Sequence, residues 1–406
     1  MIKVYMFKAG YGDTILVNIE NGSGDYNLLI DCGFGYKEGL LAYLQSNFKN
    51  KIINKFIVTH YDSDHIYSAS KFLEDNGFHN DPKLVKIGQI WLNTFKHLQF
   101  SKRIDVELNQ ETKQHIQDII AKKLSELPTD ENEGDIGAKQ ASTLGKNILK
   151  YSYSWNTDSL REAICIENIP DNISDGSIKM KLLTPNKERL ENLEEKFIKE
   201  LKELGLEPNV EDIFDDAFEL FAREKDTETK IIKEGDISST SKVVNSKTIK
   251  IFSEGKNYTK DDSIGNGSSI SFILEADGKR MLFLADAFAE DVIEQLELLY
   301  PNRSEYPLFF DLIKVSHHGS FRNNGPELYK LIDSDKFLFS TNGKHPKHTH
   351  PDVETIACII DRDLPKDVEL RELIFNYDLE HLKDFKKREL EEEFKYKIKT
   401  QLVTEL

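Results

Sequence analysis

The chain has 406 residues, long enough for one large domain or two ordinary ones, and a formal net charge of −17. The acidic balance argues against a bulk polyanion binder, but it leaves a phosphoesterase open, because a metal or local basic groove can still bind a phosphodiester. Three distant cysteines without a CxxC motif, a strand-like start at residues 1–7 and no long apolar stretch lead us to expect reduced thiols, no membrane attachment and a cytoplasmic protein.

The first part of the sequence alternates strands and helices. Apolar patterning predicts strands at residues 2–8, 14–20, 26–30, 52–59 and 87–92. Helical spacing predicts helices at 40–48 and 67–76, and Gly77 ends the second. Polar residues follow two of these strands directly, at 31–35 and 60–65, where loops carry function in layered α/β folds.

The middle of the chain is charged and mainly helical. Amphipathic patterning predicts helices at 101–127, 187–206 and 211–234, with an acidic linker at 129–135 and a strand at 178–183. We interpret the Lys/Glu runs of these helices as solvated faces. The polar stretch 238–258 is expected to be mobile.

Strand patterning returns in the last third. It predicts strands at 268–275, 281–284, 312–315, 337–340 and 373–377, and helices at 353–360 and 381–400. Asp277-Gly278 is typical of a two-residue hairpin turn between the first two strands. Together the elements predict an α/β fold with two mixed sheets between helices and one active-site edge.

The most informative segment is His60-Tyr61-Asp62-Ser63-Asp64-His65, directly after a buried strand. Two imidazoles and two carboxylates this close favour a cation among them. His60 and Asp62 can lean toward one metal ion, while Asp64 and His65 turn toward a second. The segment therefore predicts half of a two-metal site.

Two later strand ends supply further ligand types. Asp286 is positioned to bridge both ions, which would lie about 3.5–4 Å apart and ionise a shared water for attack on phosphorus or a carbonyl carbon. One residue of the pair His317-His318 is expected to be a ligand and the other a contact to substrate or to the ligands. The sequence leaves open which is which.

These motifs resemble the metallo-β-lactamase fold, and most closely its ComEC-type branch, the hydrolase domain of the DNA-uptake competence protein and its free-standing relatives. Residues 60–65 fit the HxDxDH variant of the usual HxHxDH signature. Residues 10–16 and 29–33 resemble the GxGDxxL and IDxG start, 282–286 the LLTGD motif, 316–320 the HHGS motif and 350–352 the late HPD loop. The match covers roughly 1–95, 176–186 and 265–360, in the family's order.

The resemblance implies an αββα four-layer sandwich with a large helical insertion. Residues 1–95, 176–186 and 265–360 would form the core, 96–175 and 187–264 the insertion, and 361–406 a C-terminal strand and charged helix. The implied metal ligands are His60, Asp62, Asp64, His65, Asp286, His317 and His318.

The sequence departs from the family pattern at positions that matter for the metals. Asn266 stands where the wider fold has a histidine ligand, and Asp62 replaces the commoner histidine of the signature. Tyr67-Ser68 replaces the usual Gly-Gly, which enlarges a pocket wall. The oxygen-rich set predicts two divalent ions, with Mn²⁺ or Zn²⁺ first and Mg²⁺ also compatible.

Further residues receive predicted roles. The candidate catalytic residues are Asp64, Asp286, His318 and His350: a carboxylate orients the attacking hydroxide, and an imidazole stabilises the developing negative charge. Asp31 is expected to orient the metal loop, with Asn266 and Ser320 near the site. The candidates for an anion-binding rim are Ser320, Arg322, Asn323 and Asn324, and we expect His345 and His348 to be exposed loop residues.

The predicted function is a binuclear hydrolase, with a phosphodiesterase or nuclease acting on nucleic acid or nucleotide as the first hypothesis. Another ester hydrolase of the same fold, of the phosphocholine esterase or lactonase type, is the second, because fold alone does not give substrate. The third is a subunit of a multi-protein antiviral defence system in which the insertion docks a protein partner.

Overall fold

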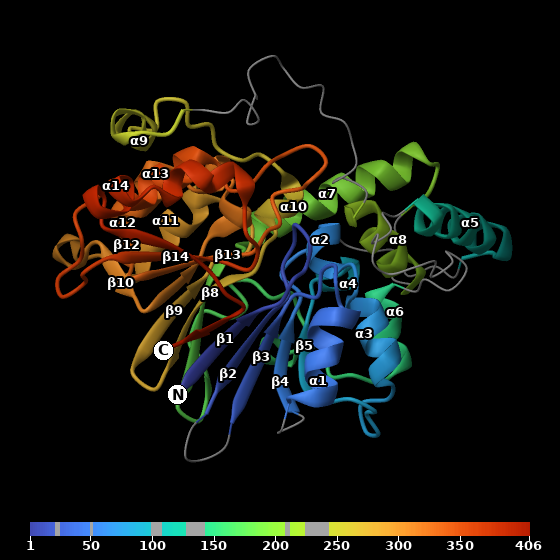
Figure 1. The fold of residues 1–406 in the computed structure, drawn as a ribbon. Helices are drawn as coiled ribbons and strands as arrows, with labels where there is room; N and C mark the ends of the chain where they lie inside the picture. Colours follow the sequence, from blue (N-terminus) through green and yellow to red (C-terminus); the bar gives the residue numbers. More distant parts are fainter. Residues whose placement is uncertain (21–24, 49–51, 99–107, 127–142, 208–211, 224–242) are drawn as a thin grey trace.

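Two β-sheets pack face to face, and helices cover the outer face of each (Figure 1). The computed structural model describes residues 1–406 except 21–24, 49–51, 99–107, 127–142, 208–211 and 224–242. No helix within these described ranges is long and apolar enough to cross a membrane. All three cysteines are buried and none is in a disulfide.

The first sheet has six strands in the order β16-β1-β2-β3-β4-β5. They are β1 (Ile2–Met6), β2 (Ile15–Ile19), β3 (Tyr26–Ile30), β4 (Ile52–Ile57), β5 (Lys86–Trp91) and β16 (Val403–Glu405). β1 to β3 form an antiparallel meander, and β4 joins β3 in parallel. Since parallel strands end at the same edge, Asp31 after β3 and the cluster after β4 emerge side by side.

The second sheet has eight strands in the order β15-β14-β13-β11-β9-β8-β7-β6. They are β6 (Ile173–Asp175), β7 (Ile178–Thr184), β8 (Ser271–Ala276), β9 (Lys279–Phe283), β11 (Leu312–Lys314), β13 (Lys336–Phe339), β14 (Arg371–Phe375) and β15 (Tyr396–Thr400). The predicted hairpin turn joins β8 to β9, with Asp277 and Gly278 at φ of 50° and 74°. β9, β11 and β13 are parallel, so Asp286, His317 and the loop after residue 340 share one edge.

Apolar side chains form three layers, which account for the αββα order. Val17 and Phe272 belong to the layer between the sheets. Phe56 packs outside the first sheet with α3 (Ala69–Asn76), and Phe337 packs outside the second with α13 (Val353–Ile360). The predicted four-layer sandwich is confirmed. The remaining helices of these outer layers are α1 (Ala42–Ser46), α11 (Ala289–Leu299), α12 (Pro326–Leu331) and α14 (Arg388–Glu393).

Helices from the predicted insertion extend the outer layer of the first sheet (Figure 1). They are α4 (Phe95–Leu98), α5 (Gln110–Glu126), α6 (Leu144–Lys150), α7 (Lys187–Glu203) and α8 (Asp212–Arg223). Phe197 of α7 and Phe218 of α8 join the same apolar cluster as Phe56. Glu195 and Lys199 on the opposite side of α7 are exposed, as predicted for solvated faces. The linker predicted at 129–135 lies outside the described residues.

Two predicted segments differ from the structure. Within 238–258, α9 (Ser246–Ser253) is an ordered helix, begun by a capping box between Asn245 and Thr248; residues 238–242 lie outside the described residues. The helix predicted at 381–400 is wrong, because the charged run ends in α14 and β15 then pairs in parallel with β14. Tyr396 is buried, so tertiary pairing outweighs the helical propensity of the Lys/Glu sequence.

Candidate functional site

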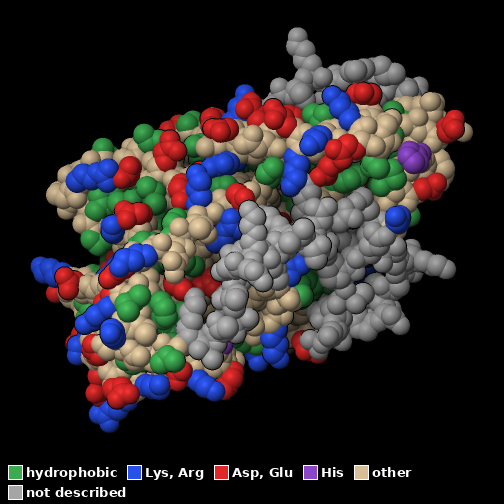
Figure 2. All heavy atoms as spheres, turned by 90° about the horizontal axis from the view of Figure 1, so that it is seen from above, with side chains coloured by type: hydrophobic (Ala, Val, Ile, Leu, Met, Phe, Trp, Pro, Cys, Tyr) green, Lys and Arg blue, Asp and Glu red, His purple; other side chains and the backbone are tan. Residues whose placement is uncertain are grey.

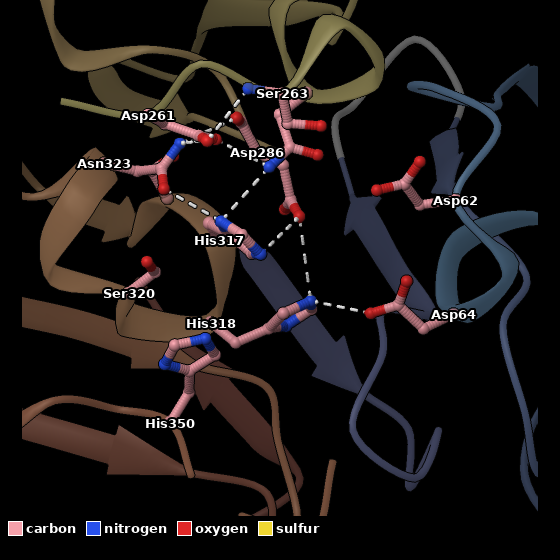
Figure 3. Close-up of polar contacts among 12 residues, drawn as sticks. Asp62, Asp64, Asp261, Ser263, Asp286, His317, His318, Ser320, Asn323 and His350 are labelled. Carbon is pink, nitrogen blue, oxygen red and sulfur yellow. Dashed lines mark hydrogen bonds and ion pairs between the residues drawn. The ribbon is translucent and has the colours of Figure 1, made fainter. Parts of the chain in front are cut away.

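Loops at one edge of the two sheets bring the predicted ligands together around Asp286. Figure 3 shows Asp62, Asp64, His317 and His318 beside it. The loop after β4 supplies His60 and His65, and α2 (Ser63–Ile66) begins inside it. The distances from the Asp286 carboxylate oxygens to the four Nε2 atoms are 3.4 Å for His65, 3.6 Å for His317, 3.8 Å for His60 and 4.0 Å for His318. Asp286 therefore lies among all four rings, the position predicted for a bridging carboxylate.

The two other carboxylates divide the rings between them. Asp62 Oδ2 lies 3.6 Å from His60 Nε2. Asp64 Oδ2 lies 3.0 Å from His318 Nε2 and 3.7 Å from His65 Nε2. Ligand atoms of His60, His65 and Asp286 lie within 4.8 Å of one another, as do those of Asp64, His65 and His318. These two groups of predicted ligands share His65, and each has the size of a metal-binding set.

Hydrogen bonds at Nδ1 fix the tautomer of three rings. His65 Nδ1 lies 2.7 Å from Asp31 Oδ2, and His318 Nδ1 lies 2.7 Å from the carbonyl of Ser340, and both partners accept. Thr59 donates its hydroxyl to Asp31 (2.8 Å), so its oxygen accepts from His60 Nδ1 at 3.0 Å. Each ring therefore carries a proton on Nδ1 and directs Nε2 into the site, the atom that a metal ion would take as ligand.

His317 is oriented in the same way by a different partner. Its Nδ1 lies 2.8 Å from Asn323 Oδ1. Asn323 Nδ2 donates to the Asp286 carbonyl and to Asp261 Oδ2, both at 3.1 Å, which fixes the amide with its oxygen toward His317. Both members of the His317-His318 pair therefore present Nε2 to Asp286. The orientation of each ring fits a ligand.

The donor set passes a direct test of fit for a cation. Among the described residues, Nε2 of His60 and His65 and Oδ1 of Asp286 are buried without a hydrogen-bond partner. Leaving such a group unsatisfied costs about 1–3 kcal/mol each. A divalent ion would satisfy all of them, since neutral imidazole and carboxylate are ligands of Zn²⁺ and Mn²⁺.

The electrostatics favour ionised carboxylates. Burial raises the pKa of Asp286, but the positive charges that His65, His317 and His318 carry when protonated outweigh it and hold that pKa well below its usual value. Burial likewise opposes ionisation of Asp64, and His65 and His318 lower its pKa. Both carboxylates are therefore charged at neutral pH, as ligands must be.

Asp13 and Lys314, for which no role was predicted, lie beneath the site. Lys314 Nζ is 2.8 Å from Asp13 Oδ2, and the two side chains are 1% and 2% exposed. Asp13 Oδ1 lies 3.5 Å from His318 Nδ1, and the Asp13 N–H donates to the Asp64 carbonyl at 3.1 Å. The pair therefore connects the loop of residues 60–65 to both sheets. Asp13 belongs to the GxGD motif, the one signal in the sequence that pointed to it.

Asn266 and Asp261 form the support behind His317. Asn266 Nδ2 donates to Asp261 Oδ2 at 2.7 Å and lies 3.3 Å from His317 Nδ1. Asn266 is therefore near the site, as expected, with its amide against the ring of a predicted ligand. Asp261 was not anticipated, because it comes from the polar stretch preceding α10 (Ile264–Gly267).

The predicted anion-binding rim is wrong for two of its members. Asn323 and Asn324 are fully buried, and Asn324 Nδ2 donates to the carbonyls of Ser316 and Ser320. Arg322 pairs with Asp262 at 2.8 Å. Ser320 is buried and donates its N–H to the His317 carbonyl at 2.7 Å, so these residues shape the loop.

The histidine-rich loop continues the row of rings outward from the site. His350 lies 5.4 Å from His317 between ring centroids, His348 lies 5.7 Å from His350, and His345 lies 5.4 Å from His348. His348 is exposed, as expected, whereas His345 is half-buried against Tyr11. Partial desolvation of the packed rings and the neighbouring imidazoles lower the pKa of His345 and of His348 to about 4, so both are neutral at pH 7.

Comparison with known proteins agrees with this architecture. Residues 8–120 match the family model described as the metallo-beta-lactamase superfamily. No curated protein matches the chain. Similar solved structures include the metallo-beta-lactamase fold protein YhfI from Bacillus subtilis (10% identity, TM-score 0.37, covering 99% of this chain and 98% of that one). A mutant of the CmlA beta-hydroxylase is also similar (9% identity, TM-score 0.31, covering 99% and 53%). Both structural likenesses are weak, and the similarity to the metallo-beta-lactamase superfamily covers residues 8–120 of the chain.

Proposed function

We propose that this chain is a metal-dependent hydrolase that holds two divalent ions and cleaves phosphodiesters. One observation carries the proposal: four imidazoles, each held through Nδ1, direct Nε2 at a central buried carboxylate. Membership of the ComEC-type branch, suggested by the HxDxDH motif, is part of this proposal.

The geometry suggests how the ligands divide. His60 and Asp62, with His317, would hold one ion, and Asp64, His65 and His318 the other. Asp286 would contact both. Such ions polarise an ester and lower the pKa of water toward neutrality. Three carboxylates in the set favour Mn²⁺ or Zn²⁺ over a purely nitrogen- and sulfur-binding metal.

The protein's own residues position these groups. Asp31 accepts from the Thr59 N–H at 2.7 Å, from the Thr59 hydroxyl and from His65, so one buried carboxylate orients two predicted ligands. His350, whose ring centroid lies 5.4 Å from that of His317 (Figure 3), is placed to donate a hydrogen bond to a phosphoryl oxygen. Asp64 is placed to accept a proton from an attacking water.

The surface favours a small phosphodiester over a long polyanion. Across the described part of the face in Figure 2, acidic and basic side chains are interspersed. The net charge of −17 also opposes long-range attraction of nucleic acid. A substrate with one or two phosphates would be recognised at the site itself.

Hydrolysis assays test the proposal. Protein loaded with Mn²⁺ or Zn²⁺ should cleave bis-p-nitrophenyl phosphate, and Asp64→Ala should lose this activity by about a hundredfold or more. A lactone and a phosphocholine ester are assayed in parallel. Cleavage of either of these without cleavage of the phosphodiester would overturn the phosphodiesterase assignment and favour another ester hydrolase of the same fold.

A further inference from the structure

A pocket opens beside Asp62, between α7, α8 and the loop that begins α10. Its lining joins Asp62 and Gly265 to apolar side chains of the two insertion helices. The empty space between these groups is about 490 Å³, including the part open to solvent. Of this space, the part that water-sized spheres can occupy is about 60 Å³, so the pocket is a shallow site against which one flat ring can pack.

The inner wall of the pocket is aromatic and rigid. Phe197 meets Phe218 and Phe221 edge-on, with ring centroids 5.2 Å and 5.6 Å apart. Phe218 also packs against Tyr61, with ring centroids 5.1 Å apart. Tyr61 stands in the sequence between the predicted ligands His60 and Asp62. Phe197 and Phe218 are 3% and 1% exposed, so the surrounding core holds the wall in place. Such a wall favours a flat apolar ring, which can pack edge-on or offset against the phenylalanines.

The rim of the pocket connects this wall to the candidate metal centre. A Cβ atom at Gly265 would lie 2.9 Å from Asp62 Oδ1, so glycine keeps the space next to that carboxylate open. Lys196 and Glu200, one helical turn apart on α7, line the outer side. They place a charged donor and a charged acceptor at the edge of any ring inside the pocket.

We propose that this pocket binds a planar ring group carried by the ester substrate, while the ester itself lies at Asp62 and the neighbouring ligands. This inference rests on the proposed hydrolase function, and it assigns substrate selection to the helical insertion. An aryl ester and a nucleotide both carry such a ring, so the experiment includes one probe for each.

The first test compares two phosphonates that have no scissile ester. Calorimetry on the full chain loaded with Mn²⁺ should show phenylphosphonate binding about tenfold more tightly than methylphosphonate, because only the former has a ring to bury. Ala222→Phe fills the pocket from half-buried Ala222 and should reduce the ratio to about twofold or less. Glu195→Phe adds the same ring to the exposed face of α7 and should keep the tenfold ratio.

Equal affinity for the two phosphonates in the wild type, or an unchanged ratio in Ala222→Phe, would overturn the pocket assignment even if the metals bind. A second test needs no metal: ligand-observed NMR with phenol and with adenosine on chelator-treated protein. Binding of either probe that Ala222→Phe abolishes supports the pocket, and the tighter probe identifies the ring as aryl or nucleobase. Absence of metal binding would refute the proposed function, whereas absence of ring binding would refute this inference.

Discussion

The buried pair of Lys314 and Asp13 provides the strongest prediction about stability. Lys314 Nζ lies 2.8 Å from Asp13 Oδ2 and also donates to the Val315 carbonyl at 3.1 Å. Replacing Lys314 with methionine preserves the apolar stem but leaves the Asp13 carboxylate buried without its cation. Breaking a buried pair in this way costs about 3–5 kcal/mol. We therefore expect Lys314→Met to lower the free energy of unfolding by that amount at pH 7.

The pH dependence of this effect has a definite sign. Burial opposes ionisation of Asp13, but Lys314 and His318 outweigh it and lower its pKa below the usual 3.8. A lowered folded-state pKa contributes stability that is present above pH 3.8 and is lost as the pH falls through the folded value. Without Lys314, Asp13 takes up a proton at higher pH. The cost of Lys314→Met should therefore shrink on acidification from pH 7 toward pH 4.

Urea denaturation of the wild type, both single variants and the Asp13→Asn/Lys314→Met double variant measures the coupling. The double variant should be more stable than the sum of the two single losses predicts. Lys279→Met is the matched control, because Lys279 also lies 2.8 Å from an aspartate, Asp311, but is 43% exposed; it should cost less than about 1 kcal/mol. A Lys314→Met loss as small as that of the control, or additive single losses, would refute the reasoning.

Three further changes have expected outcomes. Burial raises the pKa of Asp216 to about 6, so ionisation of this carboxyl opposes folding above pH 3.8. Asp216→Asn should therefore raise the thermal midpoint at pH 8 and have little effect near pH 4. Equal midpoints of the wild type and the variant at pH 8 would contradict this. Gly319 has φ of 93°, and an added Cβ would lie 2.3 Å from the Cβ of Pro351. Gly319→Ala should therefore lower the free energy of unfolding, measured with urea, by about 3 kcal/mol or more. Gly278 has φ of 74° but open space around it, so Gly278→Ala should lower it by about 1 kcal/mol. Asp31→Asn removes the acceptor charge on His65 Nδ1 and should weaken metal affinity about 10–100-fold in chelator competition; unchanged affinity would exclude the orienting role.

The fold was predictable where local pattern and tertiary environment agree. Continuous apolar runs predicted β3 and β4, and Asp277-Gly278 predicted the turn between β8 and β9, because these signals are local. The helix predicted at 381–400 is wrong because the last of these residues form β15, which pairs in parallel with β14. Charge periodicity in the sequence does not reveal that partner strand.

The candidate site shows the same division. The residues of the HxDxDH motif, Asp286 and the His317-His318 pair all converge, since each follows a strand that ends at one edge. The residues that hold these ligands in place were less predictable. Lys314 contacts Asp13 from a distant part of the chain, and Asp261 comes from a polar stretch without a motif. The pocket beside Asp62 depends on how α7 and α8 pack, which no linear motif records.

Metal stoichiometry tests the central claim most directly. Purified protein should be dialysed against Mn²⁺ or Zn²⁺ and its bound metal measured by mass spectrometry, for the wild type and for Asp286→Asn. Because Asp286 lies within 4.0 Å of all four predicted imidazole ligands, the wild type should bind two ions per chain and the variant at most one. No stoichiometric metal in the wild type, or two ions in Asp286→Asn, would contradict a two-metal centre bridged by this carboxylate.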